Sequence, residues 1–105
     1  FGATADVFID HGYPYLYNNP TLTKATRNLA QEYLGEKNVL DIDMRMTAED
    51  FAYFAQKIPA TYFRLGTKKE NCEITNLHTS NFDVDEKSMQ EAIGLMTYLA
   101  IENLK

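Results

Sequence analysis

Few residues in the chain combine a reactive side chain with the spacing that catalysis or metal binding requires. The two histidines, His11 and His78, lie far apart, and no cluster of Cys, His and carboxylate residues has the spacing of a closed metal site. The sequence contains no glycine-rich phosphate loop and no nucleophile elbow. Judged from these residues alone, His78 is a structural or solvated loop histidine and not a ligand.

Other reactive side chains also have ordinary explanations. Glu49 and Asp50 stand where first-turn acids complement the dipole of a following helix. The single cysteine, Cys72, falls in a polar stretch and is interpreted as an incidental thiol. It can form no internal disulfide, which fits a reducing, cytoplasmic compartment. Three tyrosines within residues 13–17 form either a packing seam or a binding surface, and the sequence leaves both open.

Length and composition restrict the class of protein. The chain has 105 residues, of which 45% are hydrophobic and 24% charged, as in a soluble globular domain and not a disordered tail. Its net charge of −5 argues against a nucleic-acid partner. No apolar run approaches the roughly 20 residues that span a bilayer, so no membrane partner is expected.

The elements that must position these residues follow from hydrophobic periodicity. Alternating or β-branched runs predict strands at residues 3–10, 39–42 and 61–65. Capping signals and helical spacing predict three helices. The first runs from Asn19-Pro20 to Gly35 and the second from Thr47 to Pro59. The third begins after an acidic capping box of Asp83 and Glu86 and ends near Leu104. The order β-α-β-α-β-loop-α, with a long loop at residues 67–81, predicts a layered α/β domain.

Three segments occur in an order that resembles a known family. They are MTAEDFAYF at residues 46–54, FRLG at 63–66 and LHTSNFDVDE at 77–86. This set resembles the C-terminal end of the dinuclear zinc amidohydrolases and peptidases that include aminoacylase, hippurate hydrolase, auxin-conjugate hydrolases and carboxypeptidase G. It is most similar to the hippurate-hydrolase branch. Residues 12–20 resemble the return from that family's inserted lid, or dimerisation, domain.

The resemblance implies a fold, a domain division and a set of site residues. Residues 1–12 would be the last strand of, or the return from, the lid domain. Residues 13–105 would be the C-terminal segment of a zinc-peptidase-like catalytic domain, here a partial layered α/β domain. In such enzymes the last histidine binds one of two metal ions, which assigns His78 as a metal ligand. Glu49, Gly66, Leu77 and Thr79 would support the site or line its cleft.

The resemblance also implies what the chain lacks. The parent enzyme would bind two ions of zinc, or of manganese or cobalt, and hydrolyse a small-molecule amide such as an N-acyl amino acid. The bridging carboxylate, the other ligands and the general base lie outside these residues, so the chain holds no catalytic residue. One histidine cannot hold zinc. We therefore expect the chain alone to bind no metal tightly and to be inactive.

Two further expectations come from the same interpretation. Without the rest of a catalytic domain, the chain should self-associate through exposed sheet edges or be only marginally stable. The competing hypotheses are a free-standing α/β binding or interaction module without hydrolytic activity, and a generic α/β domain that resembles the family by chance. The reading frame upstream of Phe1 would discriminate between an enzyme and a module.

Overall fold

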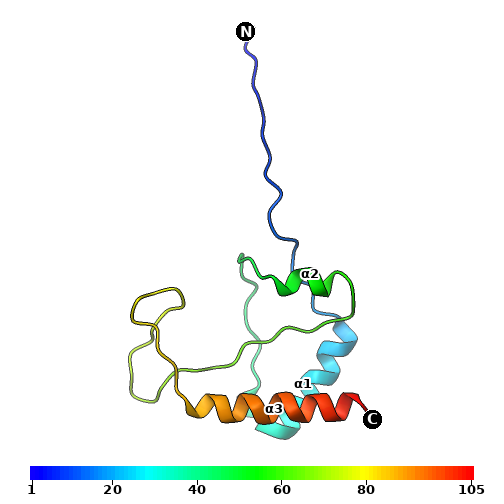
Figure 1. The fold of residues 1–105 in the computed structure, drawn as a ribbon, viewed down its shortest axis with the longest axis vertical. Helices are drawn as coiled ribbons and strands as arrows, with labels where there is room; N and C mark the ends of the chain where they lie inside the picture. Colours follow the sequence, from blue (N-terminus) through cyan, green and yellow to red (C-terminus); the bar gives the residue numbers. More distant parts are fainter.

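The computed structural model describes residues 1–105 and contains four helical elements (Figure 1). In chain order they are the α-helix α1 (Pro20–Leu34), the 3-10 turn η1 (Glu36–Asn38), the short α-helix α2 (Phe51–Ala55) and the α-helix α3 (Lys87–Asn103). The connecting segments are irregular or extended, and none of them pairs with another into a strand.

Helix α1 begins and ends where local chemistry predicts. The side chain of Asn19 accepts a hydrogen bond from the Leu22 amide at 3.0 Å, and Pro20 occupies the first turn, where its missing N–H is not needed. Gly35 ends the helix with φ of 86°, a conformation that favours glycine, and its amide bonds to the carbonyl of Gln31. The predicted helix from Pro20 to Gly35 is confirmed.

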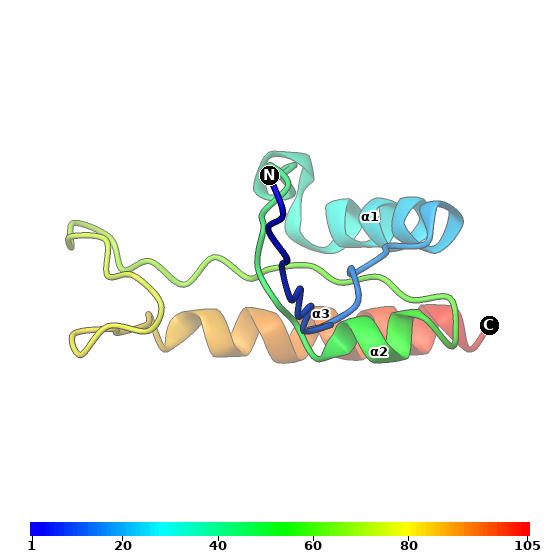
Figure 2. The ribbon, with the colours of Figure 1, turned by 90° about the horizontal axis from the view of Figure 1, so that it is seen from above.

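Helix α1 packs against α3, with the two chain directions opposed (Figure 2). The contact buries Ala30, Leu95 and Leu99, the only cluster of buried hydrophobic residues. The Tyr33 ring lies over Gly94, where an added Cβ would meet the tyrosine hydroxyl and displace that side chain. The contact between α1 and α3 is the chain's core.

The other two predicted helices differ from the structure at their N-terminal ends. Helix α2 has only five residues and ends before Pro59. Its first amide, that of Phe51, donates to the carboxylate of Glu49 and not to the predicted capping residue Thr47. Helix α3 is confirmed, but the predicted capping box is wrong. It is Asp85, and not Asp83, whose carboxylate accepts from an amide of the first turn, that of Lys87.

The predicted layered α/β fold is wrong. Residues 3–10, 39–42 and 61–65 carry no strand assignment, so the chain is a small, mainly helical unit without a sheet. A strand exists only when a neighbouring strand pairs with its backbone, and alternation of side chains cannot supply that neighbour. The Tyr62 backbone is paired instead by a side chain: the Asn18 amide accepts from its N–H at 2.7 Å and donates to its carbonyl at 2.9 Å.

The chain encloses little of its own surface. Only 6 of 105 residues are buried, and the accessible surface is 9568 Å². A compact monomer of 12.0 kDa exposes about 6,000 Å². The radius of gyration is 18.8 Å, against about 13 Å for a compact domain of this length. A large apolar surface therefore remains uncovered.

The first twelve residues extend away from the helices and are all exposed (Figure 1). The predicted strand in this segment is absent, while the domain division at residues 12 and 13 stays a prediction. The chain has no sheet edge through which it could self-associate, and self-association itself stays a prediction. None of the helices is both long enough and apolar enough to cross a membrane.

Candidate functional site

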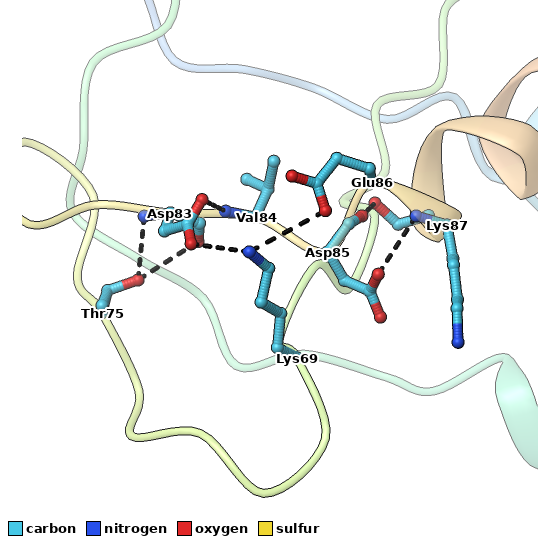
Figure 3. A network of polar contacts seen from close by, with 8 residues as sticks. Lys69, Thr75, Asp83, Val84, Asp85, Glu86 and Lys87 are labelled. Atoms are coloured by element: carbon cyan, nitrogen blue, oxygen red, sulfur yellow. Dashed lines mark hydrogen bonds and ion pairs between the residues drawn. The ribbon is translucent and has the colours of Figure 1, made fainter.

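The long loop that carries His78 is closed by polar contacts at its two ends, which we call the neck. The amide of Asp85 donates to the carbonyl of Thr67 at 2.8 Å. Inside this bond, Lys69 contacts the Asp83 carboxylate at 2.7 Å, and Thr75 exchanges two 3.2 Å hydrogen bonds with the Asp83 backbone (Figure 3). A loop whose ends meet is a common carrier of functional residues.

The ion pair of the neck shifts the titration of both partners. The hydrogen bond from Lys69 lowers the pKa of Asp83, and the amide of Val84 adds to this by donating to the same carboxylate at 2.9 Å. The hydrogen bond to Asp83 raises the pKa of Lys69, with a smaller contribution from the charge of Glu86. Glu86 lies 3.8 Å from the ammonium, on the far side from Asp83 (Figure 3). Both shifts favour the charged pair.

His78 lies in the turn at the far end of this loop and is exposed. Its backbone φ is 64°, in the left-handed region that non-glycine residues adopt only rarely. The turn is held by the Thr79 hydroxyl, which donates to the carbonyl of Asn76 at 2.7 Å, and by the Phe82 amide, which donates to the carbonyl of Thr79. Thr79 thus shapes the turn that presents His78.

Leu77 lines a groove of about 420 Å³ beside the loop. The residues on either side of Gly66, Leu65 and Thr67, line the same groove, and Gly66 itself is exposed with open space where a Cβ would stand. The structure therefore brings Leu77 and the Gly66 segment together. A second hollow, of about 270 Å³, is lined by Tyr17, Asn19 and residues 55–60 and contains none of the predicted site residues.

Glu49 lies outside this groove and has a structural contact of its own. One carboxylate oxygen accepts from the Phe51 amide at the start of α2, and the other accepts from the Tyr62 hydroxyl at 3.0 Å. The hydrogen bond to Glu49 raises the pKa of Tyr62, and burial raises it further. The Tyr62 ring packs on Phe51 with centroids 5.9 Å apart. Glu49 thus ties α2 to the segment that leads to the His78 loop.

The chain alone does not assemble a metal centre. No three His, Cys, Asp or Glu side chains are grouped so that they could hold an ion. A catalytic zinc needs about three protein ligands, so His78 by itself does not fit a resident metal. What the chain provides is one exposed imidazole on a loop whose base is fixed.

Sequence reasoning missed the residues that close the loop. Lys69 and Asp83 carry opposite charges at the two ends of the long polar segment. That pattern was available as a signal, because an unusually long loop must be held at its base if it is ordered. Arg45 and Arg64, which line the groove, were also missed, since nothing in their spacing brings them together.

Comparison with known proteins places the chain in a family. The sequence profile of the peptidase family M20/M25/M40 matches residues 3–102, which is nearly the whole chain. The chain belongs to this family. The resemblance drawn from the three ordered motifs is thereby confirmed, and the chance-similarity hypothesis is wrong.

Individual relatives agree with this assignment. The chain is similar to thermostable carboxypeptidase 1 of Saccharolobus solfataricus, with 39% identity over 97% of the chain and 26% of that protein. It is 35% identical to N-acetyldiaminopimelate deacetylase of Lactococcus lactis over 90% of the chain and 25% of that protein. The similarity to IAA-amino acid hydrolase ILR1-like 5 of Arabidopsis thaliana is 30% over 97% of the chain and 24% of that protein.

These relatives are much longer than the segment that they share with this chain. The chain spans about a quarter of the length of each of these three relatives. No solved structure gives a significant match.

Proposed function

We propose that this chain is the C-terminal segment of the catalytic domain of a metal-dependent amidohydrolase or peptidase, and that residues 1–12 form the return from a lid domain. The observation that carries the proposal is the family match over residues 3–102. The substrate would be a small amide such as an N-acyl amino acid. Relatives named as a carboxypeptidase, a deacetylase and an amino acid hydrolase support this substrate class, because each name describes hydrolysis of such a bond.

In this proposal His78 supplies one ligand to a metal centre completed by residues outside the chain. A histidine ligand must present a ring nitrogen in a fixed direction, which requires a backbone that holds it. The left-handed backbone of His78 and the Thr79 hydrogen bond beneath it support such a role. Leu77 and Gly66 would line the cleft beside this ligand, while Glu49, just before α2, would support the site.

The metal is proposed as zinc, with manganese and cobalt as the other candidates that suit a site of histidine and carboxylate ligands. Two ions would be bound in the complete enzyme. The chain's single cysteine is exposed and unpaired, and a cytoplasmic location is part of the proposal. The free-standing binding module is not favoured, because the family match extends over almost every residue.

The proposal is tested by hydrolysis of hippurate by a longer protein that contains this chain. His78→Ala should lower kcat/KM by on the order of 100-fold or more, because loss of a ligand exceeds the 10- to 100-fold effect of its supporting partners. His11→Ala is the matched control, since His11 lies in the extended N-terminal segment, and it should leave the rate unchanged. Equal activity of the two variants would refute the role of His78.

A second measurement uses the 105-residue chain. Calorimetric titration with zinc at neutral pH, without a histidine tag, should show no stoichiometric tight binding, because one imidazole is insufficient. Sub-micromolar binding that His78→Ala abolishes would show that the chain assembles a site by itself. That result would contradict the division of the metal centre between this segment and the rest of the protein.

A further inference from the structure

The loop that carries His78 has no apolar core of its own. None of the residues from Thr67 to Asp85 is buried, so the order of the loop must come from its polar contacts. Order matters because a histidine ligand has to present its ring nitrogen in one direction. A loop that is ordered only when the metal binds loses conformational entropy at that moment, and this loss lowers the affinity.

Lys69 connects the first end of the loop to the start of helix α3. Its ammonium lies 2.7 Å from the carboxylate of Asp83 and 3.8 Å from that of Glu86 (Figure 3). Glu86 immediately precedes α3, which packs against α1 in the chain's core. The Lys69 side chain is 34% exposed, and one cation between two carboxylates forms a network, which holds more firmly than an isolated surface pair. The loop is therefore fastened to a helix that is itself held in place.

Asp83 passes this restraint on to the turn at His78. Its carboxylate accepts from Lys69, while its backbone N–H and carbonyl both bond to the Thr75 hydroxyl at 3.2 Å. Thr75 stands three positions before His78 in the chain. No hydrogen bond or ion pair joins Lys69 to His78 directly. Any influence of Lys69 on the histidine must therefore pass through Asp83 and Thr75.

We propose that Lys69 is a positioning residue for His78: by holding Asp83 and Glu86 together, it keeps the His78 turn in one conformation before the metal binds. This inference rests on the proposed function, in which His78 is a metal ligand. It deepens that function by naming a residue that acts on the ligand from the opposite end of the loop. In this role Lys69 acts through the loop and not on the substrate.

The first test measures the order of the loop in the 105-residue chain by nitrogen-15 NMR relaxation. The amides of residues 76–82 should have order parameters near 0.85, the value of about a rigid backbone, and Lys69→Met should lower them below about 0.6. Lys69→Arg keeps the charge and should restore them. The matched control is Lys105→Met, which removes a lysine from an ion pair with Glu102 at the other end of α3 and should change nothing in the loop. Unchanged circular dichroism would verify the helices.

The second test measures zinc affinity, by competition with a chelator, in a longer protein that contains this chain. Lys69→Met should weaken zinc binding by about tenfold, the lower end of the range for groups that support a metal ligand. Lys69→Arg and Lys105→Met should stay within about twofold of the unsubstituted protein. In a His78→Ala background, Lys69→Met should cause no further loss, because its effect passes through the histidine. A general destabilisation would instead weaken binding in both backgrounds.

The outcomes separate this inference from the proposed function. If His78→Ala weakens zinc binding and Lys69→Met does not, the positioning role is refuted and the metal-ligand role of His78 stands. Unchanged order parameters in Lys69→Met, or equal losses in both backgrounds, would also refute the positioning role. A higher KM for hippurate at unchanged zinc affinity would place Lys69 on the substrate and overturn the inference. If His78→Ala binds zinc as tightly as the unsubstituted protein, the proposed function fails, and the role of Lys69 fails with it.

Discussion

Replacement of Leu95 by alanine tests whether the α1–α3 contact holds the helices of this chain together. Leu95 is 3% exposed and is the most buried large side chain. It packs with Leu99 and Ala30 in the only buried hydrophobic cluster, against which three partly buried side chains also pack: Leu29, Leu34 and Val39. Most of the stability of a helix in a protein comes from tertiary packing of its apolar face, so the 17-residue α3 depends on this contact.

The size of the effect follows from the surroundings of Leu95. Substitution of a buried leucine by alanine costs about 2–5 kcal/mol, and the upper values belong to rigid sites that keep the cavity open. Leu29 and Leu34 are only partly buried and can relax into the space. We therefore expect a loss of about 2–3 kcal/mol in the free energy of unfolding, or roughly 30- to 160-fold in the ratio of folded to unfolded chain.

The assay is urea unfolding followed by circular dichroism at 222 nm. Ile93→Ala is the matched control, because Ile93 lies on the same helix but is 69% exposed, and it should change stability by less than about 0.5 kcal/mol. Leu95→Ala should lower the unfolding midpoint strongly or abolish the transition. If the two variants unfold at the same urea concentration, the α1–α3 cluster is not what stabilises the helices.

Two further predictions concern polar contacts. Asn18→Ala should speed hydrogen exchange at the Tyr62 amide by about fivefold, because it removes a hydrogen bond worth about 1 kcal/mol, and unchanged exchange would contradict this role. Lys69→Met should raise the pKa of Asp83 toward its ordinary 3.8, measured by carbon-13 NMR, whereas Lys68→Met should not. The Asp83 pKa is lowered and the Lys69 pKa is raised, so the ion pair contributes fully to stability between pH 3.8 and 10.5. Its contribution decreases as the pH falls below 3.8 or rises above 10.5. An unshifted pKa of Asp83 would contradict the ion pair.

The sequence predicted those elements whose signals are local. Helix α1 follows from an Asn-Pro start and a glycine stop, which act on the neighbouring backbone alone. The strands failed because their stability depends on a partner elsewhere, and residues 61–65 find only the Asn18 side chain. Helix α2 stops early because little packs against it: of its residues only Ala52 is buried.

The candidate site was predictable in a different way. The motif resemblance selected His78, Leu77 and Thr79, and the structure places all three in one turn. It did not select Lys69 and Asp83: opposite charges at the two ends of a long loop indicate that the loop is closed, but no periodicity identifies which charges pair. The partners of such a contact follow only from the chain path.

The helices and the His78 loop are stabilised by separate sets of contacts. The α1–α3 cluster includes no residue of the segment from Thr67 to Asp85, and the neck contacts are formed entirely within that segment and by Glu86 beside it. Burial of apolar surface stabilises the α1–α3 cluster, whereas charge and hydrogen bonding stabilise the neck. The two sets of contacts therefore respond to different perturbations. A loop held by its own polar contacts can present His78 in a defined turn even where most of the apolar surface is uncovered, as it is in this chain.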